Sequence, residues 1–185
     1  GSVNTILKKN NKLYGFNTDY YALKRLIKEK KLHIKNSKIL LLGNGGVAKT
    51  SYEVLKDLKF KIIYLSSRNL RKYKDWKLNK NHKLIKWKNR NIIDANTLIN
   101  ATPIGMKNTT KEKIPIFVSA LQKFFKIIDF TVNEKKNSLE KNSQKLNIDY
   151  TSGFKLSFYQ GIKQFKIYTN KQIDEKKLMN ILKIN

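Results

Sequence analysis

The sequence predicts an α/β fold with a doubly wound parallel sheet, and three observations support this prediction. The apolar run Lys38–Leu42 leads directly into the glycine-rich residues 43–46, and a segment with apolar residues at helical spacing follows. A second apolar run, residues 60–65, completes a β-α-β unit. Two more apolar runs, residues 97–101 and 126–130, come later in the chain. The expected architecture is a Rossmann-type fold with three layers, α/β/α.

The glycine turn after the first of these runs indicates a dinucleotide site. Glycines allow positive φ and let a ligand approach the backbone closely, and the free N–H groups at a helix start favour phosphate. The usual fingerprint is G-x-G-x-x-G or G-x-G-x-x-A, whereas here the third small residue is displaced. A turn that only connects a strand to a helix is the alternative. The residues expected to contact the cofactor are Gly43, Asn44, Gly45, Gly46 and Val47.

The loop after the second apolar run predicts which dinucleotide is bound. An acidic residue at this point accepts a hydrogen bond from the ribose 2′-hydroxyl of NAD, whereas an arginine pairs with the 2′-phosphate of NADP. Residues 66–72 contain no carboxylate, and two of the four arginines of the chain lie here, which disfavours a loop that is basic only because the protein is basic. The cofactor is therefore predicted to be NADP, held by Ser67, Arg68, Asn69, Arg71 and Lys72.

The remaining elements are predicted from periodicity and turn signals. The chain begins with a short strand at residues 3–6, a turn and a second short segment at residues 13–19. Asp19 is expected to cap a helix that continues to about Lys31. Further strands are expected at residues 83–87, 97–101, 126–130 and 147–150, and helices at 117–125, 135–146, 153–168 and 174–182.

Composition restricts the class of protein. The formal net charge of +27 would suit a nucleic-acid partner, but the lysines are spread along the chain, and Asn and Ile are abundant too, as adenine- and thymine-rich codons produce. A solvated lysine surface is the favoured interpretation. The 185 residues include no cysteine and no apolar run of membrane-spanning length. We expect a cytoplasmic protein without a metal site, a membrane partner or a nucleic-acid partner.

Several short blocks, taken in order, resemble the shikimate dehydrogenase family. They are residues 3–5 (Val-Asn-Thr), 15–19 (Gly-Phe-Asn-Thr-Asp), 43–46, 67–69 (Ser-Arg-Asn), 100–106 (Asn-Ala-Thr-Pro-Ile-Gly-Met), and Gly153 with Gln160. The resemblance implies NADPH-dependent reduction of 3-dehydroshikimate to shikimate, on the route to aromatic amino acids. It also implies that residues 1–18 are the edge of a substrate domain and the inter-domain connection. Residues 19–185 would form the NADP-binding domain, with carboxyl-terminal helices that return toward the substrate domain.

The same resemblance assigns roles to individual residues. Asp19 would pair with a catalytic lysine of the amino-terminal domain, which is not among these 185 residues. Asn4 and Gln160 would bond substrate hydroxyls, and the Gly153 backbone would approach the nicotinamide amide. The remaining cofactor contacts would come from Asn100, Ala101, Thr102 and Phe130.

The chain departs from the family pattern at four positions. Val132 and Glu134 stand where the family usually has Tyr and Pro, and Ser67 and Asn69 replace Asn and Thr. Two other functions are kept open. One is an NAD-dependent quinate or shikimate dehydrogenase, and the other is a basic nucleotide-binding module with nucleic-acid affinity and no catalysis. Both a monomer and a homodimer are compatible with the sequence.

Overall fold

The computed structural model describes residues 2–107 and 112–184, which fall into two compact units. The first unit combines Gly1–Lys31 with Phe154–Asn185, and the second is the continuous segment Leu32–Gly153. This grouping places the helix after Asp19 with the amino-terminal strands. The domain boundary between residues 18 and 19 stays a prediction about the complete molecule.

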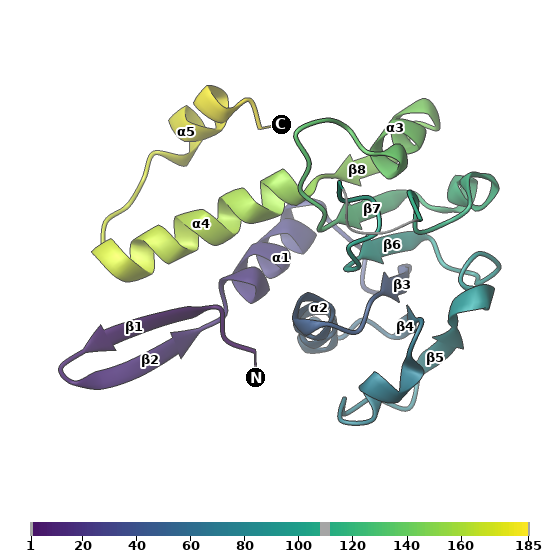
Figure 1. Ribbon diagram of the computed structural model, residues 1–185, viewed down its shortest axis with the longest axis horizontal. Coiled ribbons are helices and arrows are strands. Elements are labelled where there is room, and N and C mark those ends of the chain that lie inside the picture. The colour runs from purple at the N-terminus through teal and green to yellow at the C-terminus, as the bar shows by residue number, and fades with distance from the viewer. Residues whose placement is uncertain (1, 108–111, 185) are drawn as a thin grey trace. The chain divides into compact units, whose positions relative to one another are not determined.

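The second unit is built on a six-stranded parallel sheet (Figure 1). Its strands, in spatial order β5-β4-β3-β6-β7-β8, follow the Rossmann arrangement and confirm the predicted fold class. The strand order reverses between β3 and β6, so a crevice forms beyond the carboxyl ends of these two strands. The strands are β3 (Lys38–Leu42), β4 (Ile62–Ser67), β5 (His82–Lys86), β6 (Thr97–Asn100), β7 (Lys126–Asp129) and β8 (Asp149–Thr151).

The central strands form the core because they are covered on both faces. Residues 39–42 of β3 and 98–100 of β6 are each 0% exposed, which explains why both read as continuous apolar runs rather than as alternating patterns. Helix α2 (Gly46–Asp57) packs on β3, and α3 (Ser138–Lys145) packs beside β8. The described residues of this unit also form three short 3₁₀ helices, namely η1 (Leu70–Tyr73), η2 (Trp87–Asn89) and η3 (Val118–Lys123).

The helix expected at residues 117–125 is wrong, because this segment forms only η3. Leu121 and Phe124 must both enter the core, and they are almost fully buried. The helical turn ends at Phe124, whose backbone is extended with φ of −92° and ψ of 128°, so the segment does not continue as a helix to Phe125. Helix α3 also begins later than expected, because Asn137 caps it by accepting from the Glu140 N–H at 2.8 Å.

The first unit contains a β-hairpin and three helices (Figure 1). Strands β1 (Thr5–Lys9) and β2 (Lys12–Phe16) are antiparallel, and the two turn residues between them, Asn10 and Asn11, have φ of 48° and 56°. Positive φ at both central residues matches the right-handed twist of the strands, and asparagine tolerates it. The helices are α1 (Thr18–Glu29), α4 (Gly153–Thr169) and α5 (Glu175–Leu182).

Asp19 is not the cap of α1, as the sequence suggested, because the helix begins two residues earlier than that cap would require, at Thr18. Asn17 is the N-cap, and its Oδ1 accepts from the Tyr20 N–H at 2.9 Å. The Thr18 backbone N–H bonds instead to the Asn4 side chain at 2.9 Å, which draws the helix start toward the hairpin. The Asp19 carboxylate, in the first turn, is therefore left for other contacts.

Packing within the first unit centres on Arg25. Its guanidinium lies 4.1 Å from the centroid of the Tyr159 ring and pairs with Glu29 at 2.8 Å and Glu175 at 2.6 Å. The Tyr159 hydroxyl donates to Glu29 at 2.5 Å. These contacts hold α1, α4 and α5 together. On α4, Leu156 and Tyr159 are buried, whereas Phe165, toward the far end of the helix, is exposed.

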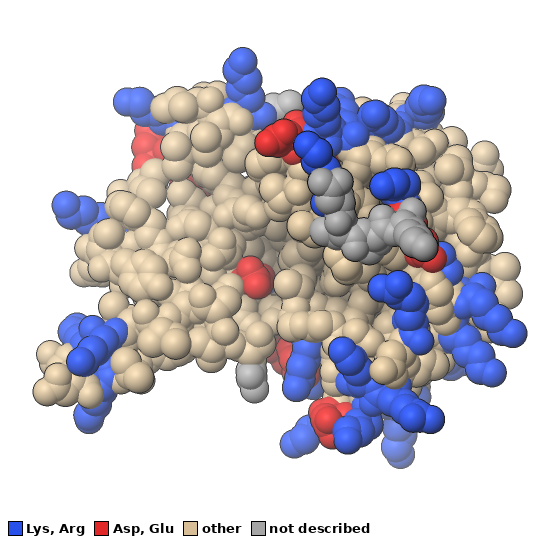
Figure 2. Space-filling model, viewed as in Figure 1, with Lys and Arg blue, Asp and Glu red and all other residues tan. Residues whose placement is uncertain are grey.

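Basic side chains are dispersed over the surface. On the face shown in Figure 2, Lys and Arg are scattered over the hairpin and the α/β unit and do not gather into one stripe. No helix among the described residues is long and apolar enough to cross a membrane.

Candidate functional site

The glycine turn after β3 requires glycine at its first position. Gly43 has φ of +115°, and a Cβ there would lie 2.5 Å from the carbonyl oxygen of Ala101, the residue after β6. The Ala101 N–H donates to the Leu42 carbonyl at 2.9 Å, so the two chain segments are held in this close approach. Gly43 therefore shapes the crevice between β3 and β6.

Tyr73, in η1, holds the same turn in place through a hydrogen bond. Its buried hydroxyl donates to the Gly43 carbonyl at 2.7 Å. Burial raises the pKa of Tyr73 to about 12, so the hydroxyl keeps its proton and stays a donor at neutral pH. No local pattern in the sequence indicates this role, because the contact joins residues thirty positions apart.

Gly45 has the opposite environment from Gly43. It is the N-cap of α2, its φ is −85°, and a Cβ built on it would meet nothing within 4 Å. The space above the helix start is therefore open, and no side chain caps the first N–H groups of α2. Open space at a helix start with free N–H groups fits the pyrophosphate of a dinucleotide.

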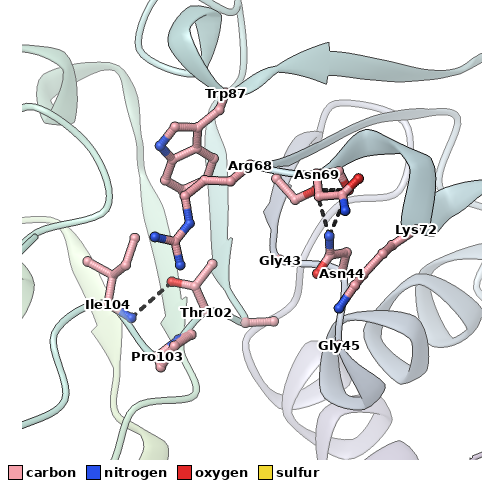
Figure 3. A pocket seen from close by; sticks show the side chains of 12 residues that line it. Gly43, Asn44, Gly45, Arg68, Asn69, Lys72, Trp87, Thr102, Pro103 and Ile104 are labelled. Atoms are coloured by element: carbon pink, nitrogen blue, oxygen red, sulfur yellow. Dashed lines mark hydrogen bonds between the residues drawn. The ribbon is translucent and has the colours of Figure 1, made fainter. Parts of the chain in front are cut away.

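A cleft of about 380 Å³ joins this turn to the loops after the neighbouring strands (Figure 3). Its walls come from the turns after β3, β4, β5 and β6, as expected for the carboxyl edge of a doubly wound sheet. The lining residues that the sequence predicted are Gly43, Asn44, Gly45, Ser67, Arg68, Asn69, Lys72, Ala101 and Thr102. Those that it did not predict are Trp87, Pro103 and Ile104.

Asn44 links the glycine turn to the arginine loop. Its Nδ2 donates to Ser67 Oγ at 3.0 Å and to the Asn69 carbonyl at 2.8 Å, and the Ser67 hydroxyl donates to the same carbonyl at 3.0 Å. With the loop held in this way, Arg68 is directed into the cleft between Trp87 and Thr102 (Figure 3).

Asn100, predicted to contact the cofactor, is completely buried and does not line the cleft. Its Oδ1 accepts from the Thr102 hydroxyl at 2.6 Å, and its Nδ2 donates to the Ile104 carbonyl at 3.1 Å. Asn100 therefore shapes the cleft wall through two residues that do line it. The other predicted cofactor residues that lie outside the lining are Gly46, Val47, Arg71, Phe130 and Gly153.

Asp129 is a buried carboxylate that sequence reasoning treated only as part of a strand. It is 0% exposed and accepts from Asn100 Nδ2 at 2.9 Å, Asn137 Nδ2 at 2.9 Å and the Tyr150 hydroxyl at 2.8 Å. The backbone N–H and the hydroxyl of Thr131 also donate to it, at 3.0 and 2.8 Å. Burial and this carboxylate raise the pKa of Tyr150, which keeps the hydroxyl a donor. In the sequence, the only sign of this role is a single acidic residue near the end of an apolar run.

Gly153 has a structural reason to be glycine. A Cβ at this position would overlap the carbonyl group of Thr131, because the start of α4 passes close to the backbone after β7. Phe130, the residue before Thr131, is half-buried. The expected approach of Gly153 to a nicotinamide stays a prediction.

In the first unit, two of the residues predicted to bind substrate lie together. The Asn4 side chain bonds to the Asp19 carboxylate, while Asn4 Oδ1 accepts from the Thr18 hydroxyl and the Thr5 hydroxyl, each at 3.1 Å. Burial raises the pKa of Asp19, and the bond from Asn4 opposes this effect only in part.

Gln160 connects to this pair through a residue that the sequence analysis missed. Its Nε2 donates to Gln164 Oε1 at 3.3 Å, and Gln164 Nε2 donates to the Thr5 hydroxyl at 3.1 Å. Because Thr5 bonds to Asn4, a continuous hydrogen-bonded chain joins Gln160 to Asp19. The spacing of four residues between the two glutamines on α4 was the signal that could have revealed it. Among the residues described, no group of three or more His, Asp or Glu side chains could hold a metal ion.

The sequence is similar to curated shikimate dehydrogenases (NADP(+)) of clostridia. It is 34% identical over 161 residues to that of Clostridium botulinum strain Hall, which covers 86% of this chain and 62% of the relative. It is 30% identical over 185 residues to that of Clostridium perfringens strain SM101, covering 98% of this chain and 67% of the relative. The chain thus spans about two thirds of the length of these relatives. No family model matches it.

Solved structures show the same similarity. Shikimate dehydrogenase 1 from Peptoclostridium difficile superposes with a TM-score of 0.82 at 30% identity, covering 98% of this chain and 67% of that one. A quinate dehydrogenase from Corynebacterium glutamicum in complex with NAD gives a TM-score of 0.83 at 18% identity, over 98% of this chain and 68% of that one. The second comparison shows the fold alone.

The two glycines of the turn predict opposite effects of one added methyl group. Gly43→Ala forces a positive φ on alanine and a clash with Ala101, so we expect it to lower the free energy of unfolding by about 1–3 kcal/mol or more. Gly45→Ala meets no clash, so it should lower that free energy only by the cost of a poorer N-cap, about 1 kcal/mol or less, yet weaken NADPH binding about tenfold or more. Urea unfolding and calorimetric titration measure the two quantities. If Gly45→Ala left the affinity for NADPH unchanged, the assignment of the pyrophosphate to this helix start would be wrong.

The raised pKa of Asp19 predicts a pH-dependent effect on stability. Since the folded state favours the protonated carboxyl, the stability that Asp19 contributes is complete below its unfolded pKa of about 3.8 and falls as the pH rises through the folded value. Asp19→Asn, which stays neutral, should therefore be more stable than the parent at pH 7, and the advantage should vanish near pH 3.5. Urea unfolding at both pH values tests this, and a variant less stable than the parent at pH 7 contradicts it.

Proposed function

The chain belongs to the shikimate dehydrogenase family, and from this premise we propose that it supplies the NADP-binding half of an enzyme that reduces 3-dehydroshikimate to shikimate. The family relationship gives an NAD(P)-binding domain of Rossmann type. The choice of NADP, the substrate and the activity of the complete molecule are parts of the proposal, because the chain spans only 62% of the first relative.

The observation that carries the proposal is that one cleft contains both the open helix start at Gly45 and the side chain of Arg68. A pyrophosphate fits the first, and a second phosphate on the adenosine ribose fits the second. No residue that lines this cleft is acidic, so none offers the carboxylate that accepts from the 2′-hydroxyl of NAD. Arg68 and Lys72 together favour the more negatively charged cofactor.

When bound, NADPH supplies a hydride to the carbonyl carbon of 3-dehydroshikimate, and the carbonyl oxygen takes up a proton. The chain's own contribution at the cofactor is to hold it, through the N–H groups of α2 and the side chain of Arg68. Asn100 and Asp129 keep the wall formed by Thr102 and Ile104 in place.

The proton step involves Asp19 in this proposal. Burial raises the pKa of Asp19, and a cationic neighbour would favour its ionised form. The family resemblance implies such a neighbour, a lysine from the amino-terminal domain. Asp19 orients that lysine, and the lysine delivers the proton. Asn4 and Gln160, at the two ends of the hydrogen-bonded chain through Gln164 and Thr5, would bond the substrate hydroxyls.

Two alternative functions remain open to test. An NAD-dependent quinate or shikimate dehydrogenase would have the same fold, but Arg68 in the cleft disfavours NAD. A nucleic-acid module is favoured only by the net charge of +27, and on the face shown in Figure 2 the described lysines and arginines are scattered rather than gathered into one stripe.

Arg68→Ala should discriminate between the two cofactors. Loss of a charge-assisted contact should weaken NADPH by about 1–3 kcal/mol, toward the lower end because Arg68 is exposed, and leave NADH nearly unchanged. Lys74→Ala is the matched control, since Lys74 is an exposed cation shortly after the same loop that does not line the cleft. Calorimetric titration of both variants with both cofactors provides the measurement. Equal losses of NADPH and NADH affinity in Arg68→Ala would count against the 2′-phosphate role.

The chain by itself should bind NADPH but not reduce 3-dehydroshikimate, because the proton-donating lysine is not supplied. NADPH consumption followed at 340 nm, with and without the ketone, measures turnover, and calorimetry on the same sample verifies binding. Rapid turnover by the 185-residue chain would contradict the assignment of the proton donor to another domain.

A further inference from the structure

Trp87 is an aromatic residue of the cleft that no sequence motif indicated. It begins η2, directly after β5, and lines the cleft beside Arg68 (Figure 3). Only two tryptophans occur in the chain, and the other, Trp76, is buried against Tyr73 and Tyr52 and does not line the cleft. An indole at a ligand cleft provides a large flat apolar surface.

The indole of Trp87 is held rigidly from inside the protein. The guanidinium carbon of Arg90 lies 3.9 Å from the centroid of the Trp87 ring, and Arg90 Nη1 donates to the Trp87 carbonyl at 2.9 Å. Arg90 is itself anchored, because it is 7% exposed and its Nε donates to the Pro115 carbonyl at 2.7 Å. A stacked cation from the protein therefore covers one part of the ring, and the remainder lines the cleft.

The order of the strands places this ring on the adenosine side of the cleft. The glycine turn follows β3, Arg68 follows β4, and Trp87 follows β5, so the three lie in sequence along the sheet edge. A dinucleotide whose pyrophosphate lies at Gly45 and whose 2′-phosphate lies at Arg68 extends its base toward β5.

We propose that Trp87 is the platform on which the adenine base of the cofactor stacks, with Arg90 holding the ring from behind. The inference rests on the proposed NADP-binding function and adds a specificity-determining residue to it. Stacking on an indole needs no hydrogen-bond partner on the base, so the site would take any purine. Recognition of the 2′-phosphate by Arg68 is then separate from recognition of the base.

The test uses adenosine 2′,5′-bisphosphate, which carries the base and the 2′-phosphate but no nicotinamide. In the Trp76→Phe chain, Trp87 is the only tryptophan, so a base stacked on its ring should change the emission in proportion to binding. Nicotinamide mononucleotide carries no adenine and should leave the emission unchanged. Isothermal calorimetry with the same ligands and with NADPH measures binding independently of fluorescence.

Two variants test whether the aromatic surface is required. Trp87→Leu should weaken adenosine 2′,5′-bisphosphate about 5- to 100-fold, and Trp87→Phe should restore most of the affinity. A residue needed only for packing would not distinguish phenylalanine from leucine in this way. The emission experiment leaves Trp87 intact and so remains decisive if Trp87→Leu does not fold.

The outcomes separate the two proposals. Binding of the bisphosphate with a changed Trp87 emission supports the platform. Binding of NADPH and the bisphosphate without any change in Trp87 emission overturns it and leaves the proposed NADP function standing. Absence of binding by both ligands overturns the proposed function and the platform together.

Discussion

The cofactor crevice depends on the close approach of two backbone segments, the turn after β3 and the turn after β6. Gly43 leaves no room for a Cβ in front of the Ala101 carbonyl, and the Ala101 N–H is bonded to Leu42. β3 and β6 are paired neighbours at which the sheet order reverses, and this contact holds the two turns that follow them close together at the carboxyl edge.

The walls of the crevice are stabilised by buried polar groups, not by apolar packing alone. A buried carboxyl group loses its hydrogen bonds to water, which is costly unless protein donors replace them. Asp129 has donors from three side chains and from both the backbone and the hydroxyl of Thr131, so the balance favours its burial. Through Asn100, this carboxylate determines where Thr102 and Ile104 stand. Asn44 has the corresponding role for the arginine loop.

The parts of the fold that were predictable from the sequence are those encoded locally. The apolar runs of β3 and β6, the glycine turn and the arginine after β4 each depend on neighbouring residues, and the predicted Rossmann class is confirmed. The features that were predicted wrongly or missed depend on contacts between residues far apart in the chain. Either Asn17 or Asp19 could cap α1, and the bond between Asn4 and Thr18 decides for Asn17. The roles of Tyr73, Asp129 and Trp87 come from the pairing of segments far apart in the chain, which periodicity does not reveal.

The central claim is that the α/β unit is a preformed NADP-binding cleft, and backbone amide NMR of the unmodified chain tests it most directly. Titration with NADPH should shift the amides of residues 43–48, 67–72 and 101–104, while the amides of the hairpin residues 5–16 stay unchanged. Shifts dispersed over the lysine-rich surface, or no shifts in the glycine turn at saturating NADPH, would contradict the claim.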